Sequence, residues 1–123
     1  MAEGTSVICD RYLASSLTFQ VVDGEGGITT DWIESINHPI LTPDLTFLID
    51  VPVEVSLARI AKRGKPLERF EVEATLREVR ARYLYAARHH AQRLGQLHIV
   101  DGQPAPEEVA ARIQAHLAEY MAR

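Results

Sequence analysis

The sequence has little cysteine and no long apolar stretch. Its one cysteine, Cys9, cannot form a disulfide within the chain, and this favours an intracellular protein. Because Cys9 lies inside an apolar run, we expect it in the core rather than as a nucleophile. No apolar run approaches the roughly 18 residues of a membrane span, and residues 1–4 open no signal peptide. These absences predict a cytoplasmic protein that is not inserted in a membrane.

The chain also has no excess of positive charge. Its 13 Lys and Arg against 17 Asp and Glu give a net charge of -4, which argues against a general nucleic-acid binder. A shared metal site is not indicated either, because His89 and His90 are adjacent and would point in different directions on a helix. Any phosphate chemistry must therefore use a local basic segment.

Strands and helices are expected to alternate along the 123 residues. Three apolar runs predict short strands at residues 6–10, 45–50 and 97–101. Helical spacing of apolar residues, with proline and glycine at the ends, predicts helices over 13–19, about 31–38, 52–64, about 72–93 and from 106 onward. Such alternation within one small domain is typical of a parallel α/β sheet.

A basic segment interrupts this acidic chain at residues 59–71, RIAKRGKPLERFE. It is broken by Gly64 and Pro66. A positive, hinged segment between two helices suits closure over a polyphosphate, where fixed cations stabilise charge on the transferred oxygens. The alternative is a solvated basic surface, and the local sequence leaves both interpretations open.

An acid and a base, Asp10 and Arg11, follow the first predicted strand. The carboxyl ends of parallel strands are where ligands bind in α/β sheets. Arginine can bind a phosphate in two places, and aspartate can hold Mg²⁺ through water. Gln20, slightly further on, has the donor and acceptor needed to read a base edge. A strand-end salt bridge is the structural alternative for the charged pair.

In combination, these residues resemble the motifs of the thymidylate kinase family. Residues 10–20, DRYLASSLTFQ, resemble its D-R-Y-x-x-S-x-x-A-Y-Q signature. Residues 43–52, PDLTFLIDVP, resemble its P-D-L-T and L-D-V-P motifs, and residues 63–71 resemble its lid with D-R-x-E. The motifs appear in order over nearly the whole chain. Three mild departures are Thr18, Phe19 and Glu68, where the family has Ala, Tyr and Asp.

The resemblance implies a P-loop nucleoside monophosphate kinase-like fold, with a parallel sheet in three α/β/α layers. It implies one partial kinase domain over residues 1–123, with a lid at about 62–71. The implied activity is dTMP kinase, EC 2.7.4.9, which transfers a phosphoryl group from ATP to dTMP in dTTP biosynthesis. Mg²⁺ with ATP is the implied cofactor. ATP and dTMP are the expected partners, with no nucleic acid and no membrane.

The resemblance also implies a role for each matching residue. Arg11 would hold the phosphate of dTMP, and Asp10 would help to orient Mg²⁺ through water. The thymine would be bordered by Ser15, Ser16, Phe19 and Gln20. The cations expected to reach ATP are Arg59, Lys62, Arg63 and Arg69. The residues implied as catalytic are Asp10, Arg11, Arg63 and Arg69.

The sequence has no P-loop motif, G-x-x-x-x-G-K-[ST], which the family uses to cradle phosphates. Its only Gly-Lys, Gly64-Lys65, is followed by Pro66 and has Arg59 where the first glycine should be. We therefore expect an incomplete fold of about three strands without the P-loop strand. Unpaired strand edges would make it marginally stable or self-associating. A reading frame that starts too late, a split gene or a fragment would each produce such a chain. We expect the isolated chain to be inactive.

Two other hypotheses stay open beside a partial thymidylate kinase. One is another P-loop nucleotide kinase, although Gln20 and the D-R-Y context argue against it. The other is a non-catalytic fragment that binds a nucleotide or a protein partner, which the missing P-loop favours. The expected protein partner is a second copy in a homodimer or a complementing N-terminal half. Turnover restored by an N-terminal half would indicate a split enzyme, and binding without turnover would indicate the module.

Overall fold

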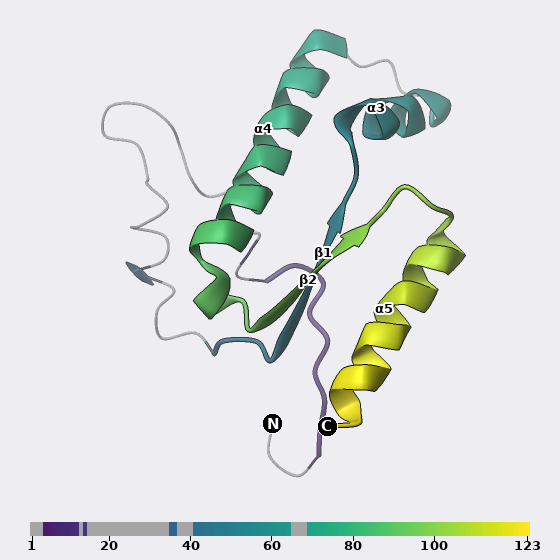
Figure 1. Cartoon of the computed structure of the whole chain (residues 1–123). Helices are drawn as coiled ribbons and strands as arrows, with labels where there is room; N and C mark the ends of the chain where they lie inside the picture. The colour runs from purple at the N-terminus through teal and green to yellow at the C-terminus, as the bar shows by residue number, and fades with distance from the viewer. Residues whose placement is uncertain (1–3, 13, 15–34, 37–40, 65–68) are drawn as a thin grey trace.

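The computed structural model describes residues 4–12, 14, 35–36, 41–64 and 69–123. From residue 41 onward, regular structure begins with a strand and ends with a helix (Figure 1). The elements are β1 (Leu45–Asp50), α3 (Val53–Lys62), α4 (Arg69–His89), the 3₁₀ helix η1 (Ala91–Arg93), β2 (Gln96–Asp101) and α5 (Pro106–Met121).

The two strands form a parallel sheet in which Leu45 lies opposite Gln96 and Asp50 opposite Asp101. The predicted strand at 45–50 is confirmed, and the one predicted at 97–101 begins one residue earlier. Gly95 makes the turn into β2 with a φ of +66°, and a Cβ there would lie 2.0 Å from the Pro43 carbonyl oxygen. The turn therefore requires glycine.

Helices α4 and α5 cover opposite faces of this sheet (Figure 1). Alternate side chains of a strand point to opposite faces, so Phe47 and Asp50 of β1 face different sides. Arg80 of α4 binds Asp50, whereas the ring of His116 on α5 lies 6.2 Å from the ring of Phe47. The result is a three-layer α/β/α arrangement, as the resemblance implied.

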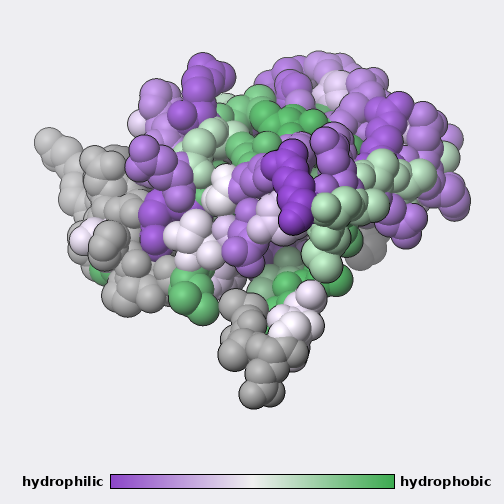
Figure 2. Space-filling view, turned by 60° about the horizontal axis from the view of Figure 1, so that its bottom comes forward, coloured by the Kyte–Doolittle hydropathy of each residue, from purple (hydrophilic) through white to green (hydrophobic). Residues whose placement is uncertain are grey.

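The buried core of the described residues is small. Its apolar members are Val53, Ala86, Leu94, Val100 and Val109. By contrast, Ile49 of β1 and Ile99 of β2 are 50% and 55% exposed, although they lie inside the two strands. Apolar surface appears between polar regions in the space-filling view (Figure 2). Each face of the sheet is therefore only partly covered.

The strand predicted at residues 6–10 is not formed. Residues 5–9 have no regular secondary structure, and Ile8 is 92% exposed. Cys9 is exposed as well, so the prediction that it lies in the core is wrong. A strand needs a neighbour for its backbone hydrogen bonds, and the described sheet consists of β1 and β2 alone. The described part of the chain thus has two strands instead of about three.

The predicted helices around the sheet are largely confirmed. Helix α3 begins after Pro52 and ends before Gly64, whose φ is +72°. Helix α4 stops at His89 rather than near Arg93, because His90 leaves the helical conformation (φ -122°, ψ 25°) and a 3₁₀ turn follows. Helix α5 begins at Pro106 as predicted. None of the helices in the described ranges is long and apolar enough to cross a membrane.

The helices predicted at 13–19 and about 31–38 lie mostly outside the described residues. Ala14, Ser35 and Ile36 are helical. Leu117, an apolar residue of α5, is 40% exposed, so the apolar side chains of this helix are not all buried.

Candidate functional site

The predicted site residues that the structure describes fall into two groups. Asp10 and Arg11 lie in the N-terminal segment, and Arg59, Lys62 and Arg63 lie in the last turns of α3 and just after it. The backbone of Arg69 opens α4, but its side chain is outside the described part. The predicted thymine contacts are outside it as well, namely Ser15, Ser16, Phe19 and Gln20.

The D-R-Y segment has an unusual backbone. Arg11 has a φ of +64°, and among the described residues it is the non-glycine residue with a positive φ. Such conformations cost energy and cluster at ligand sites. The Tyr12 hydroxyl donates a hydrogen bond to the Leu41 carbonyl oxygen at 3.0 Å, which fixes this segment near the residues leading into β1. Asp10 and Arg11 are exposed and accessible to a ligand.

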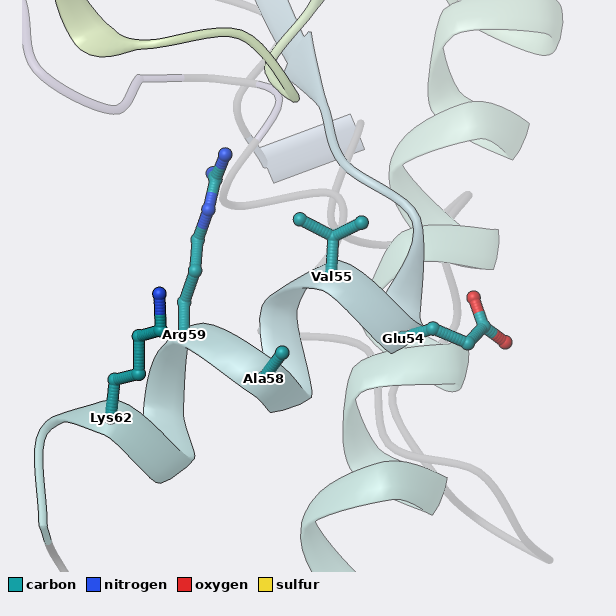
Figure 3. Close-up of a pocket in the computed structure, with 5 residues that line it drawn as sticks. All are labelled: Glu54, Val55, Ala58, Arg59 and Lys62. Carbon is teal, nitrogen blue, oxygen red and sulfur yellow. The ribbon is translucent and has the colours of Figure 1, made fainter.

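One side of α3 lines an open hollow of about 370 Å³, which Figure 3 shows in close-up. Val55 and Ala58 provide apolar lining, and Arg59 and Lys62 extend from the same side of the helix. Glu54 points to another side (Figure 3). The hollow thus combines an apolar surface with two cations, a composition suited to a ligand with a flat ring and phosphates.

Arg59 binds the turn between β2 and α5. Its Nη1 donates to the Gly102 carbonyl oxygen at 3.0 Å, and its Nη2 donates to the Gln103 carbonyl oxygen at 2.7 Å. This turn is itself attached to the end of β1, because the Gly102 amide donates a hydrogen bond to the Asp50 carbonyl oxygen at 2.8 Å. The hollow therefore lies near the carboxyl ends of both strands, where α/β sheets bind ligands.

A paired carboxylate, Asp50, ends β1. Arg80 of α4 donates to both of its oxygens, from Nε to Oδ1 at 2.8 Å and from Nη2 to Oδ2 at 3.0 Å. The hydrogen bond from Arg80 lowers the pKa of Asp50 below its ordinary value, although partial burial opposes this. The ionised carboxylate thus joins α4 to the carboxyl end of β1.

A second ion pair joins α3 to α4. Arg77 Nη2 lies 3.0 Å from Glu54 Oε1 and 2.7 Å from Glu73 Oε1. The pKa of Glu54 is lowered, first by a hydrogen bond from its own backbone amide in the opening turn of α3 and then by Arg77. These side chains are largely exposed, so the pair orients the helices more than it stabilises them.

Sequence reasoning missed both ion pairs. Glu73 and Arg77 stand four residues apart on a helix, which is a visible signal. Asp50 and Arg80 are 30 residues apart, so only the fold brings them together. Of the predicted cations, Arg59 and Lys62 share the hollow, whereas Arg63 does not line it. The described residues include no group of three or more metal-ligating side chains.

Comparison with known proteins gives one family. A sequence model described as thymidylate kinase matches residues 1–113. The thymidylate kinase of Thermomicrobium roseum is 41% identical over 130 residues, which cover 100% of this chain and 59% of the relative. The probable thymidylate kinase of Pyrobaculum aerophilum is 36% identical over 111 residues, covering 90% of this chain and 53% of the relative.

A third relative agrees with these two. The thymidylate kinase of Chromohalobacter salexigens is 35% identical over 127 residues, covering 99% of this chain and 58% of the relative. The chain therefore spans less than two thirds of the length of these curated relatives and corresponds to their C-terminal part. No solved structure matches the chain.

Proposed function

This chain belongs to the thymidylate kinase family, and we propose that it forms part of a site that transfers a phosphoryl group from ATP to dTMP. The observation that carries the proposal is the family match over residues 1–113. The strained, exposed Arg11 of the D-R-Y motif and the cationic hollow on α3 support it. The product would be dTDP.

The acceptor side of the proposed site is the D-R-Y segment. Arg11 would bind the phosphate of dTMP, because a guanidinium can donate two parallel hydrogen bonds to phosphate oxygens. The residues proposed to border the thymine are Ser15, Ser16, Phe19 and Gln20, and this part of the proposal is supported by the sequence motif. Arg11 would thereby place the acceptor oxygen for in-line transfer.

The donor side is the hollow on α3 together with the cations that follow this helix in the sequence. Lys62 and Arg63, with Arg69 at the start of α4, would bind ATP phosphates and stabilise the charge that develops on them during transfer. Mg²⁺ would neutralise part of that charge when it is bound with ATP. Asp10 suits it, because an exposed carboxylate can hold a hydrated Mg²⁺ through water.

We further propose that turnover needs a P-loop, which the 123-residue sequence does not contain. The half-exposed Ile49 and Ile99 and the exposed Val7 and Ile8 leave apolar surface available for another polypeptide. A complementing N-terminal half or a second copy of the chain would bury it. The second candidate function is that of a non-catalytic module, which would bind a partner through the same apolar surface.

The test is dTMP-dependent release of ADP from Mg-ATP. We expect no turnover from the purified chain, provided that circular dichroism shows it folded. We expect turnover when a polypeptide with the part of the Thermomicrobium roseum relative that precedes the match is added. Turnover by the chain alone would contradict the need for a P-loop. A stable complex that binds nucleotide without turnover would favour the non-catalytic module.

The role of Arg11 is tested in the active mixture. We expect Arg11→Ala to lower kcat/KM for dTMP by about 100-fold or more, because a charge-assisted phosphate contact is lost. The matched control is Arg112→Ala, an exposed arginine that pairs with Glu108 on α5 at 2.8 Å. The control should retain activity. Unchanged activity in Arg11→Ala would show that its assignment is wrong.

A further inference from the structure

The hydrogen bonds around the carboxyl end of the sheet form a closed ring through four segments. Arg80 on α4 binds the Asp50 carboxylate, and the Asp50 carbonyl accepts from the Gly102 amide. The Gly102 carbonyl then accepts from Arg59 on α3. The ring closes where Glu54 at the start of α3 pairs with Arg77, one turn before Arg80 on α4.

Arg59 occupies a position in this ring that differs from that of a phosphate ligand. Its two terminal nitrogens are each used by a backbone carbonyl, at 3.0 Å to Gly102 and 2.7 Å to Gln103. Gly102 is buried just beyond β2, so its carbonyl group requires a donor from the protein. The planar fork of arginine supplies two donors at once, and lysine cannot reproduce that geometry.

The β2–α5 turn, residues 102–105, is closely packed on β1 and has little freedom to find another arrangement. A Cβ on Gly102 would lie 2.5 Å from Val51 Cγ2 and 2.7 Å from Ile49 Cγ2. The Gln103 amide is held as well, by Asp101 Oδ1 at 3.0 Å. Arg59 thus connects a rigid turn to the helix that lines the hollow.

Lys62 provides the contrast on the same helix. It lies one turn after Arg59 and lines the same hollow. Within the described ranges its side chain makes no hydrogen bond or ion pair. Its ammonium group is therefore available to an anionic ligand, whereas the guanidinium of Arg59 is engaged by the protein.

We propose that Arg59 is a positioning residue, which holds the β2–α5 turn at the edge of the α3 hollow, rather than a ligand of the ATP phosphates. Asp50, Arg80, Glu54 and Arg77 support it by fixing α3 and β1 on α4. This proposal rests on the proposed function only in treating the α3 hollow as a nucleotide site. The bonding of the turn is a property of the chain by itself.

Amide hydrogen exchange of the 123-residue chain tests the proposal without any assay of activity. In Arg59→Gln we expect the Gly102 and Gln103 amides to exchange about tenfold faster, because the turn loses both bonds to α3. Arg59→Lys should restore less than half of the lost protection. The matched control, Lys62→Gln, removes the same charge from the same helix and should leave these amides unchanged.

The opposite results would overturn the proposal. Exchange at Gly102 within about twofold of the wild type in Arg59→Gln would show that the turn does not depend on Arg59. Full protection in Arg59→Lys would show that charge, not the guanidinium fork, is what matters. If Arg59→Gln unfolds the chain, the proposal can still be tested on the wild-type protein, by using NMR to measure how fast its arginine guanidinium groups rotate. Slow rotation of the Arg59 guanidinium compared with Arg63 supports the ring, and equally fast rotation overturns it.

Mg-ATP separates this proposal from the proposed function. In the mixture with the N-terminal polypeptide, Lys62→Gln should weaken ATP binding and leave exchange at Gly102 unchanged. Suppose that exchange at Gly102 is fast in Arg59→Gln and that neither the wild type nor any variant binds ATP. This result would support the hydrogen-bonded ring and contradict the proposed nucleotide site. ATP binding that Arg59→Gln weakens, with exchange at Gly102 unchanged, would make Arg59 a direct ligand and overturn the ring.

Discussion

Two apolar runs of this chain have similar composition and different structures. Residues 45–50, LTFLID, form β1, whereas residues 6–10, SVICD, form no strand and leave Ile8 exposed. Both runs end in an aspartate, Asp50 and Asp10. The difference is the neighbour, since β1 pairs along its length with β2. Strand propensity becomes a strand only where another strand satisfies the backbone.

The two regions also hold their charged residues differently. Asp50 is fixed by two hydrogen bonds from Arg80, and its main chain is fixed by Gly102. The D-R-Y segment is anchored by the bond from Tyr12 to Leu41 and has a strained Arg11. The region around Asp50 thus provides a preorganised framework, and the D-R-Y segment has exposed side chains.

The largest expected effect is on the turn that brings β2 beside β1. Gly95→Ala should lower the free energy of unfolding by about 3 kcal/mol, because it adds a left-handed strain and a clash with the Pro43 carbonyl. The control is Gly64→Ala, which has a φ of +72° but nothing within 4 Å of a Cβ. It should cost about 1 kcal/mol. Equal losses in urea denaturation would contradict the role of the close approach.

A valine in each region sharpens the contrast between them. Val100→Ala should lower the free energy of unfolding by about 2 kcal/mol, because Val100 is 4% exposed and its truncation leaves a cavity. Val7→Ala should change it by less than about 0.5 kcal/mol, because Val7 is 59% exposed. Urea denaturation measures both. A large loss in Val7→Ala would mean that residues 6–10 are packed in solution.

A smaller effect than at Gly95 or Val100 is expected at Asp50. Asp50→Asn should lower the free energy of unfolding at pH 7 by about 1 kcal/mol, since the neutral amide keeps only one oxygen that can accept a hydrogen bond from Arg80. The pKa of Asp50 is depressed in the folded state, so its stabilisation is present above the ordinary value of 3.8 and is lost as the pH falls below it.

Thermal unfolding at pH 7 and pH 3 checks this dependence. The difference between the wild type and Asp50→Asn should narrow at pH 3. Asp44→Asn is the control, because Asp44 is exposed and has no ion pair among the described residues. A gap between wild type and Asp50→Asn that stays constant with pH would show that the charge of Asp50 contributes nothing.

Local sequence signals predicted much of the framework. Pro52 and Gly64 marked the ends of α3, Pro106 marked the start of α5, and the apolar run at 45–50 marked β1. These signals work because backbone restrictions at proline and glycine act within a few residues. The end of α4 was predicted less accurately, because no proline or glycine marks the point at His90 where the helix stops.

The candidate site was predicted less completely. The motifs identified Arg11 and the α3 cations, whose chemical groups can be read from the sequence. They did not reveal that Arg59 faces two backbone carbonyls, because Gly102 and Gln103 stand more than 40 residues away. All of the proposed site roles stay predictions, namely those of Asp10, Arg11, Ser15, Ser16, Phe19, Gln20, Lys62, Arg63 and Arg69.

The sequence by itself determined the family, the order of β1, β2 and the helices, and the chemical groups available to a phosphate. Tertiary structure decided whether an apolar run becomes a strand, and whether a cation is free or engaged. Strand pairing and hydrogen bonds such as those of Asp50 and Arg59 depend on segments distant in sequence. Composition reports what a residue can bind, but only the fold determines which partner lies within reach.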